Sequence, residues 1–188
     1  MSQEDLLARI LRLLEEREVE YFLTGSLVSS MQGEPRATHD IDFVIEDRVP
    51  LVADLQAACQ APRFYLDEIA AREAMAARSS FNLIDSEEGL KVDFWLLDGK
   101  AYDRSRIARR VRTTVPVGAC WVSSPEDTIL IKLVWCNRSG FSEKQFWDAL
   151  RVFEVQSRTL DLAYLELWAD RLGVRELWNR LKGEAKPL

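Results

Sequence analysis

The sequence predicts an α/β (α+β) protein whose last third is helical. Short segments with the twofold alternation of β-strands occur up to about residue 122, and helical segments separate them. After Ser124 every long segment has helical periodicity. With 188 residues, 47% of them apolar, the chain is long enough to bury a core. We therefore expect an α/β domain over residues 1–122 and a helical region over 123–188.

The first segments alternate between helix and strand. Residues 2–17 form an amphipathic helix, which Ser2 caps with Asp5 at the capping-box position. The stretch VEYFLTG is a short strand that ends at Gly25, and SLVSSMQG is a short helix. After a loop, DIDFVIE is a second strand.

The middle and last segments continue this pattern. Residues 50–60 form a helix that Pro50 opens, and SFNLIDSEEGLKVDFWLL contains two strands joined by a turn. The arginine-rich RSRIARR is a helical turn, and RTTVPVGACWVSS is a hairpin that pivots on Gly118. Four helices complete the chain, beginning near SPEDT, SEKQF, DLAYL and VRELW.

Charge and cysteine usage narrow the class of protein. The net charge is −6, with 25 basic and 31 acidic residues, so we expect no strong general binding to nucleic acid. The three cysteines form no CxxC pair, as is typical of reduced cysteines in the cytosol. The charged N-terminus is unlike a signal peptide, and no apolar stretch reaches the length of a membrane span. We expect a soluble cytoplasmic protein without membrane association.

Two strands carry carboxylates on one face. Side chains alternate along a strand, so Asp40 and Asp42 project side by side, opposite the apolar Ile41. Asp93 lies on the polar face of the strand LKVDFWLL and joins them if the two strands are neighbours. Carboxylates this close repel one another, and Mg2+ removes that repulsion. Two Mg2+ ions ~4 Å apart can activate a hydroxyl and stabilise a leaving pyrophosphate.

The Gly-Ser pair before the short helix is a candidate phosphate site. Gly25 permits a close backbone approach, the helix N-terminus offers free N–H groups, and the Ser26 hydroxyl adds a donor. Taken alone, an Asp-x-Asp pair is often a surface feature and Gly-Ser a common turn. The order of strand, Gly-Ser, helix, Asp-x-Asp strand and later aspartate is what favours the functional interpretation.

These motifs resemble the DNA-polymerase-β-like nucleotidyltransferase superfamily. FLTGS, a spacer of thirteen residues, DIDFVIE and then KVDFWLL match its signature over roughly the first 115 residues. The resemblance implies a short mixed sheet flanked by helices. The phrase PRATHDID is similar to small bacterial AbiEii-like and MntA-like toxin–antitoxin nucleotidyltransferases, and the helical tail is similar to the AbiEii-like branch.

The resemblance also implies roles for individual residues. Asp40 and Asp42 would bind two Mg2+ ions, with Mn2+ as an alternative ion. Asp93 would bind one of them and act as the base toward an acceptor hydroxyl, and Gly25 and Ser26 would hold the triphosphate of an NTP.

Three further residues and one arginine-rich segment each have two open interpretations. Arg36 and Thr38 either reach the β- and γ-phosphates or belong to a solvated loop. Lys132 either points into the cleft toward a phosphate or packs its stem while its ammonium reaches water. The arginine run at 104–112 is either a solvated face or a docking patch, and no aromatic residue interleaves with it in the sequence.

Two functions follow as expectations. The first is an enzyme that transfers NMP from an NTP to a hydroxyl of a protein, an RNA or a small molecule. The second is a binding module of the same fold with little or no activity, which acts through a protein partner such as a toxin or antitoxin. Asp40→Asn and Asp42→Asn separate the two, because only the enzyme loses its effect.

Overall fold

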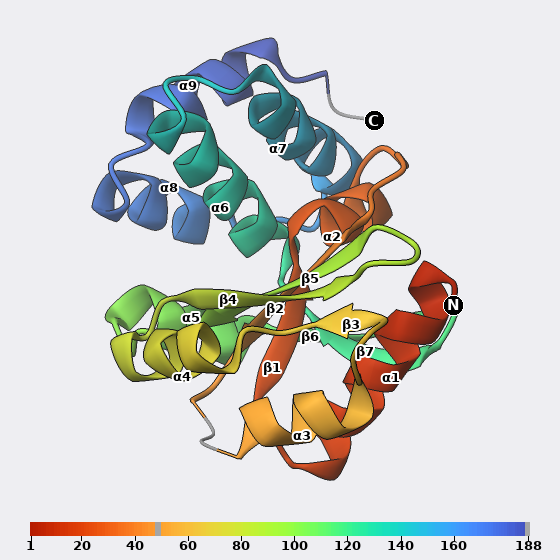
Figure 1. The fold of residues 1–188 in the computed structure, drawn as a ribbon. Coiled ribbons are helices and arrows are strands. Elements are labelled where there is room, and N and C mark those ends of the chain that lie inside the picture. The colour runs from red at the N-terminus through yellow and green to blue at the C-terminus, as the bar shows by residue number, and fades with distance from the viewer. Residues whose placement is uncertain (48–49, 187–188) are drawn as a thin grey trace. The chain divides into compact units, whose positions relative to one another are not determined.

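The chain forms two compact units, which are described separately. The computed structural model describes residues 1–47 and 50–186 (Figure 1). The first unit comprises residues 1–24 and 38–122 and is called the sheet unit here. The second comprises residues 25–37 and 123–188 and is called the helical unit. The sequence predicts a domain division at 122/123, which stays a prediction; in these compact units the segment 25–37 groups with the C-terminal helices.

The sheet unit contains a mixed sheet with the strand order β3-β4-β5-β2-β1-β7-β6. Its strands are β1 (Tyr21–Thr24), β2 (Asp40–Ile45), β3 (Phe64–Tyr65), β4 (Ser80–Asp85), β5 (Leu90–Leu96), β6 (Val111–Val115) and β7 (Gly118–Val122). The central strand β2 pairs antiparallel with β1 and parallel with β5. The hairpins β4–β5 and β6–β7 are antiparallel, as their sequence patterns predict.

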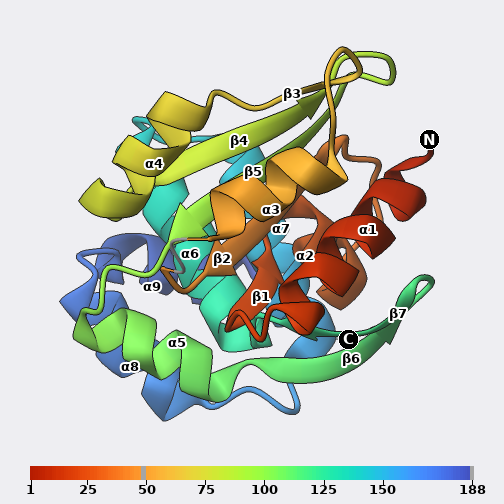
Figure 2. The same cartoon turned by 60° about the horizontal axis from the view of Figure 1, so that its bottom comes forward.

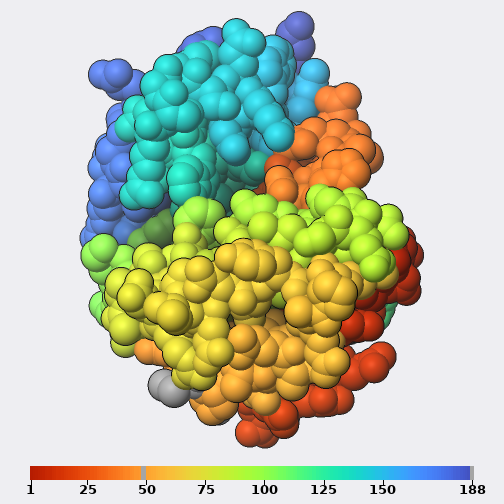
Figure 3. All heavy atoms as spheres, viewed as in Figure 1, coloured from red at the N-terminus to blue at the C-terminus, as the bar shows by residue number. Residues whose placement is uncertain are grey.

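One face of this sheet is packed by helices. The helices of the sheet unit are α1 (Gln3–Glu16), α3 (Leu51–Ala58), α4 (Glu68–Ala77) and α5 (Ala101–Arg109). Figure 2 shows α1, α3 and α4 on the same side of the sheet, and α3 and α4 also form much of the surface visible in Figure 3. The core between sheet and helices contains Phe43 and Phe94, whose rings stack with centroids 5.8 Å apart. The alternating apolar residues of β2 and β5 thus face the core, as predicted.

The helical unit consists of α2 (Gly25–Gln32), α6 (Pro125–Arg138), α7 (Glu143–Gln156), α8 (Leu162–Arg171) and α9 (Arg175–Glu184). Side chains of Ser124, Ser142 and Asp161 cap α6, α7 and α8, so the sequence marks each of these helix starts. Trp178 of α9 is fully buried and meets Phe153 edge-on, with ring centroids 5.5 Å apart.

The observed elements confirm most of the predicted ones and add two. The capping box of Ser2 and Asp5 is present in α1. Sequence reasoning missed α4 and the two-residue β3, although Asp67 and the alanine-rich run behind it are a good helix start. The arginine-rich segment is a nine-residue helix, α5, rather than a single turn. Within residues 1–47 and 50–186, no helix has the length and apolarity that crossing a membrane requires.

Candidate active site

The predicted carboxylates lie on one face of strands β2 and β5, opposite the core residues Phe43 and Phe94. These strands pair in parallel with Asp42 opposite Asp93 and Asp40 opposite Lys91. Neighbouring residues in register project from the same face of a sheet. The sequence prediction that the two strands are neighbours is therefore confirmed, and three carboxylates share one face with one lysine.

Lys91 and Trp95 contact this carboxylate face. The Lys91 Nζ lies 2.8 Å from Asp93 Oδ2, and Trp95 Nε1 donates a long hydrogen bond of 3.4 Å to Asp42 Oδ1. The hydrogen bond with Asp93 raises the pKa of Lys91, and the charges of Asp93, Asp40 and Asp42 add to this effect. All three carboxylates thus act on the same ammonium group, which marks this face as a site that favours a cation.

Thr24 adds an unsatisfied hydroxyl to the same face. It is the last residue of β1 and lies opposite Asp42 in the antiparallel register. The side chain is 7% exposed, and its Oγ1 has no hydrogen-bond partner. A buried hydroxyl without a partner is unusual in a folded protein and calls for a physical reason.

The residues of this face suit Mg2+ in their chemistry. Magnesium prefers hard oxygen ligands and binds through one or two carboxylates, and here carboxylates and a free hydroxyl share one surface. In the part of the chain that the structure describes, however, no group of three or more His, Cys, Asp or Glu side chains is arranged to hold a metal ion. Lys91 forms an ion pair with Asp93 on this face.

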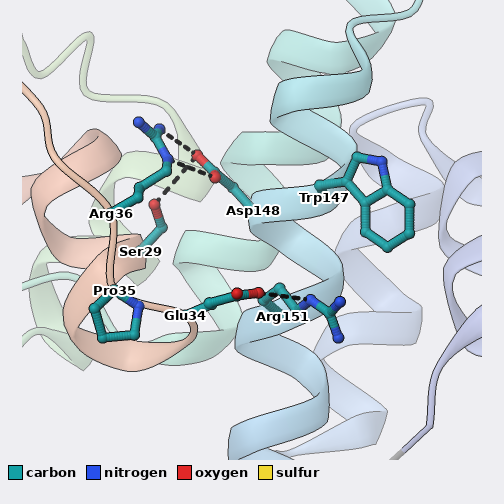
Figure 4. Close-up of a pocket in the computed structure, with 7 residues that line it drawn as sticks. All are labelled: Ser29, Glu34, Pro35, Arg36, Trp147, Asp148 and Arg151. Atoms are coloured by element: carbon teal, nitrogen blue, oxygen red, sulfur yellow. Dashed lines mark hydrogen bonds and ion pairs between the residues drawn. The ribbon is translucent and has the colours of Figure 1, made fainter.

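A second polar cluster lies inside the helical unit, around Asp148 of α7. Arg36 donates to both carboxylate oxygens, from Nε to Oδ1 at 3.0 Å and from Nη2 to Oδ2 at 2.8 Å. Lys132 of α6 donates to Oδ2 at 2.7 Å, and Ser29 of α2 donates to Oδ2 at 3.3 Å. Figure 4 shows Arg36 and Ser29 converging on Asp148.

Ser26 completes this cluster at the start of α2. Its Oγ accepts from Arg36 Nη2 at 2.6 Å and from Lys132 Nζ at 3.4 Å. The preceding Gly25 has a φ of 72°, a conformation that favours glycine. The sequence-predicted residues Gly25, Ser26, Arg36 and Lys132 therefore lie together at the N-terminus of one helix.

The cluster has an excess of positive charge. Burial raises the pKa of Asp148, but the hydrogen bond from Arg36 and the charge of Lys132 outweigh it, so the pKa lies below its ordinary value. One carboxylate thus faces two cations, Arg36 and Lys132, which leaves one positive charge in excess. Together with the helix N-terminus, this charge favours an anion.

The structure shows that Arg36 and Lys132 both contact Asp148, and their predicted contacts with a phosphate stay predictions. Arg36 is not a solvated loop residue, because it forms a two-pronged ion pair with Asp148. Lys132 does not extend to water, because its side chain is 3% exposed and its ammonium contacts Asp148. From the sequence, Asp148 is either the surface partner of Lys144, four positions before it, or a residue that orients a lysine near the site. The structure pairs it with Lys132, although Asp148 itself was not predicted as a binding residue.

Thr38 has a local role in the sheet unit. Its carbonyl accepts from Gln3 Nε2 at 2.9 Å, and its hydroxyl accepts from the Asp40 N–H at 3.3 Å. These contacts position the start of β2. Its predicted contact with a phosphate stays a prediction.

A pocket of about 340 Å³ adjoins the Asp148 cluster within the helical unit (Figure 4). It is lined by Ser29, Glu34, Pro35, Arg36, Trp147, Asp148 and Arg151. Arg151 pairs with Glu34 at 3.0 Å and lies 5.5 Å from the centroid of the Trp147 ring. The charged groups on its wall therefore pair with one another.

The arginine run of α5 and β6 forms pairs within the sheet unit. Arg110 contacts Glu20 at 3.2 Å, and Arg112 contacts Glu15 at 2.7 Å. Both guanidinium groups also lie against the ring of Trp121, at 4.8 and 5.4 Å from its centroid. An aromatic residue from β7 therefore does interleave with the run, which the linear sequence conceals.

Comparison with solved structures identifies the fold. The chain is similar to ANT(2″)-Ia, solved in complex with adenylyl-2″-tobramycin (TM-score 0.59, 13% identity, 94% of this chain and 99% of that chain). It is also similar to the lincomycin-bound lincosamide adenylyltransferase LnuA (TM-score 0.56, 14% identity, 82% and 98% of the two chains). A third match is an antigenic nucleotidyltransferase-like protein from Paracoccidioides brasiliensis (TM-score 0.53, 16% identity, 97% and 93%).

The chain therefore has the nucleotidyltransferase fold that its motifs predict. One of the matched structures, LnuA, is named a lincosamide antibiotic adenylyltransferase. No protein-family model matches the chain, and the search of curated proteins finds no match.

Proposed function

We propose that the protein is a metal-dependent nucleotidyltransferase that moves NMP from an NTP to a hydroxyl group. The observation that supports this most is the placement of Asp42 directly opposite Asp93, with Asp40 on the same face, in a chain with the nucleotidyltransferase fold. A structural role for these carboxylates would not require them to gather on one face, where they repel one another.

In this proposal the sheet unit supplies the metal ligands and the base. Asp40, Asp42 and Asp93 would hold Mg2+, which when bound neutralises charge on the phosphates and the leaving pyrophosphate. Asp93 would accept the proton of the acceptor hydroxyl, and the oxygen would attack the α-phosphorus as the bond to pyrophosphate breaks. Lys91, which pairs with Asp93 at 2.8 Å, would have to release this carboxylate first.

The helical unit contains a candidate triphosphate site of its own at the start of α2. There Gly25 offers its backbone N–H, and Ser26, Arg36 and Lys132 offer hydrogen bonds or positive charge. Asp148 would act as a positioning residue, because it fixes the Arg36 guanidinium and the Lys132 ammonium relative to each other. Thr38 would add a contact from the loop before β2.

A label-transfer assay tests the proposal. The purified protein is incubated with Mg2+, host lysate and each of the four NTPs labelled at the α-phosphate, beside an Asp40→Asn/Asp42→Asn variant. The exposed Glu73→Gln on α4 is the matched control, because it removes an acidic charge elsewhere on the sheet unit. We expect one nucleotide to label a protein, an RNA or a small molecule, and the label to disappear in the double variant alone. Absence of label from folded wild-type protein with all four NTPs would contradict the proposal.

A second candidate is a binding module with little or no catalysis. It is favoured by the ion pair between Lys91 and Asp93, which neutralises one of the three carboxylates that the enzyme would use for a metal ion. Such a protein would act on a partner, and the similarity of PRATHDID to the AbiEii-like and MntA-like group suggests a bacterial toxin or antitoxin in the cytoplasm. In that case the Asp40→Asn/Asp42→Asn variant keeps its biological effect.

A further inference from the structure

Thr24 stands out among the buried polar groups of the sheet unit. Its Oγ1 has no hydrogen-bond partner, although the residue is 7% exposed. The register places it opposite Asp42 on β2, and Asp42 is in turn opposite Asp93 on β5. Three polar side chains therefore lie in one row across three neighbouring strands, on the face that carries the carboxylates.

The unpaired hydroxyl is unfavourable for the protein alone. A buried hydroxyl that loses its water without gaining a partner destabilises the folded state. Valine has nearly the same shape as threonine and is favoured in strands, so it would satisfy this position without the penalty. A threonine in a strand end beside two carboxylates is therefore best explained by a ligand that uses its oxygen.

We propose that the Thr24 hydroxyl is part of the cation site, where its oxygen accepts a hydrogen bond from a water molecule of the hydrated divalent ion held by Asp42 and Asp93. This inference rests on the proposed function, since it requires the metal site. Magnesium keeps several waters when one or two carboxylates bind it, and those waters need acceptors nearby. A hydroxyl has two lone pairs to offer, and those of Thr24 are unused by the protein.

Binding of Mn2+ in the absence of NTP tests this role without relying on activity. Free Mn2+ is measured by its electron paramagnetic resonance signal in titrations of wild type, Thr24→Val, Thr24→Ser and Asp42→Asn. We expect Thr24→Val to bind Mn2+ about 5- to 10-fold more weakly, the factor typical of one lost hydrogen bond. Thr24→Ser, which keeps the hydroxyl, should remain within about twofold of wild type, and Asp42→Asn should lose binding.

Thermal melting without metal provides the second readout. Thr24→Val should melt at the wild-type temperature or above it, because it removes an unsatisfied buried group. If the Thr24 hydroxyl had only a structural role, its removal would lower the melting temperature. Weaker Mn2+ binding without a lower melting temperature therefore indicates a role in the cation site.

The outcomes separate this inference from the proposed function. If wild type binds Mn2+ and Asp42→Asn does not, while Thr24→Val binds like wild type, the role of Thr24 is wrong and the metal site stands. Melting of Thr24→Val below wild type would also overturn the inference, because the hydroxyl would then have a structural partner. If wild type binds no Mn2+, both the metal site and the role of Thr24 are wrong.

Discussion

Replacing Asp148 by asparagine should strongly destabilise the helical unit. The Asp148 side chain is 10% exposed and that of Lys132 is 3% exposed, so their ion pair is largely shielded from water. Removing one member of a buried pair costs roughly 3–5 kcal/mol, because the other charge stays buried. Arg36 is 29% exposed and can turn toward water, so we expect the lower end, about 3 kcal/mol.

Urea unfolding followed by circular dichroism at pH 7 measures this loss. The double variant Lys132→Met/Asp148→Asn should recover much of the free energy of unfolding, because it removes the buried ammonium together with its counter-ion. Glu184→Gln is the matched control: its pair with Arg180 is exposed, and we expect a change below about 0.5 kcal/mol. Two results would refute the idea of a buried ionic cluster. One is that the losses in free energy of unfolding of the two single variants add up in the double variant, and the other is a loss below about 1 kcal/mol for Asp148→Asn.

The pH dependence of the same variant gives an independent check. The pKa of Asp148 is lower in the folded protein than its ordinary value, so its ionised form stabilises the folded state. This contribution is complete above the unfolded pKa of about 3.9 and is lost as the pH falls through the lower folded value. The difference in the free energy of unfolding between wild type and Asp148→Asn should therefore keep its full size from about pH 5 to 7. It should shrink below about pH 4.

Three further predictions concern other parts of the chain. Gly33→Ala should lower the free energy of unfolding by about 1–3 kcal/mol, because a Cβ would lie 2.8 Å from the Val152 backbone nitrogen. Urea titration measures this loss, and an unchanged midpoint of unfolding would contradict it. Lys91→Met should bind Mn2+ about 2- to 5-fold more tightly, because it removes the ammonium that neutralises Asp93; weaker binding in the same titration would show that Lys91 supports the site. Burial raises the pKa of Cys120 to about 11, so this thiol should not react with a disulfide reagent at pH 8 until urea unfolds the protein. Fast labelling of Cys120 in the native protein would contradict this prediction.

Local patterns in the sequence predicted the elements and the carboxylate face. Alternation in DIDFVIE and LKVDFWLL placed the aspartates opposite the apolar residues, and the structure has Phe43 and Phe94 in the core accordingly. These predictions succeed because the period of a strand is a local property of the chain. The α4 helix was not predicted, although its cap Asp67 is a local signal in the sequence.

Which side chains pair with one another could not be predicted from the sequence in the same way. Lys132 and Asp148 are sixteen positions apart, and Asp148 and Arg36 are 112 apart, so their pairing depends on how α2, α6 and α7 pack. For the same reason the sequence left open whether Lys132 extends to water. It also did not reveal that the guanidinium groups of Arg110 and Arg112 both lie against the ring of Trp121.

The sequence by itself determined the strand and helix pattern, the shared face of Asp40 and Asp42, and the resemblance that predicted the nucleotidyltransferase fold. Only the tertiary structure decided that Asp148 faces two cations and that the Thr24 hydroxyl is left without a partner. These two features depend on the packing of distant helices and the register of distant strands, whereas Lys91 and Asp93 are two residues apart on β5. Charge pairing and desolvation act through space, and the linear order of residues does not record those distances.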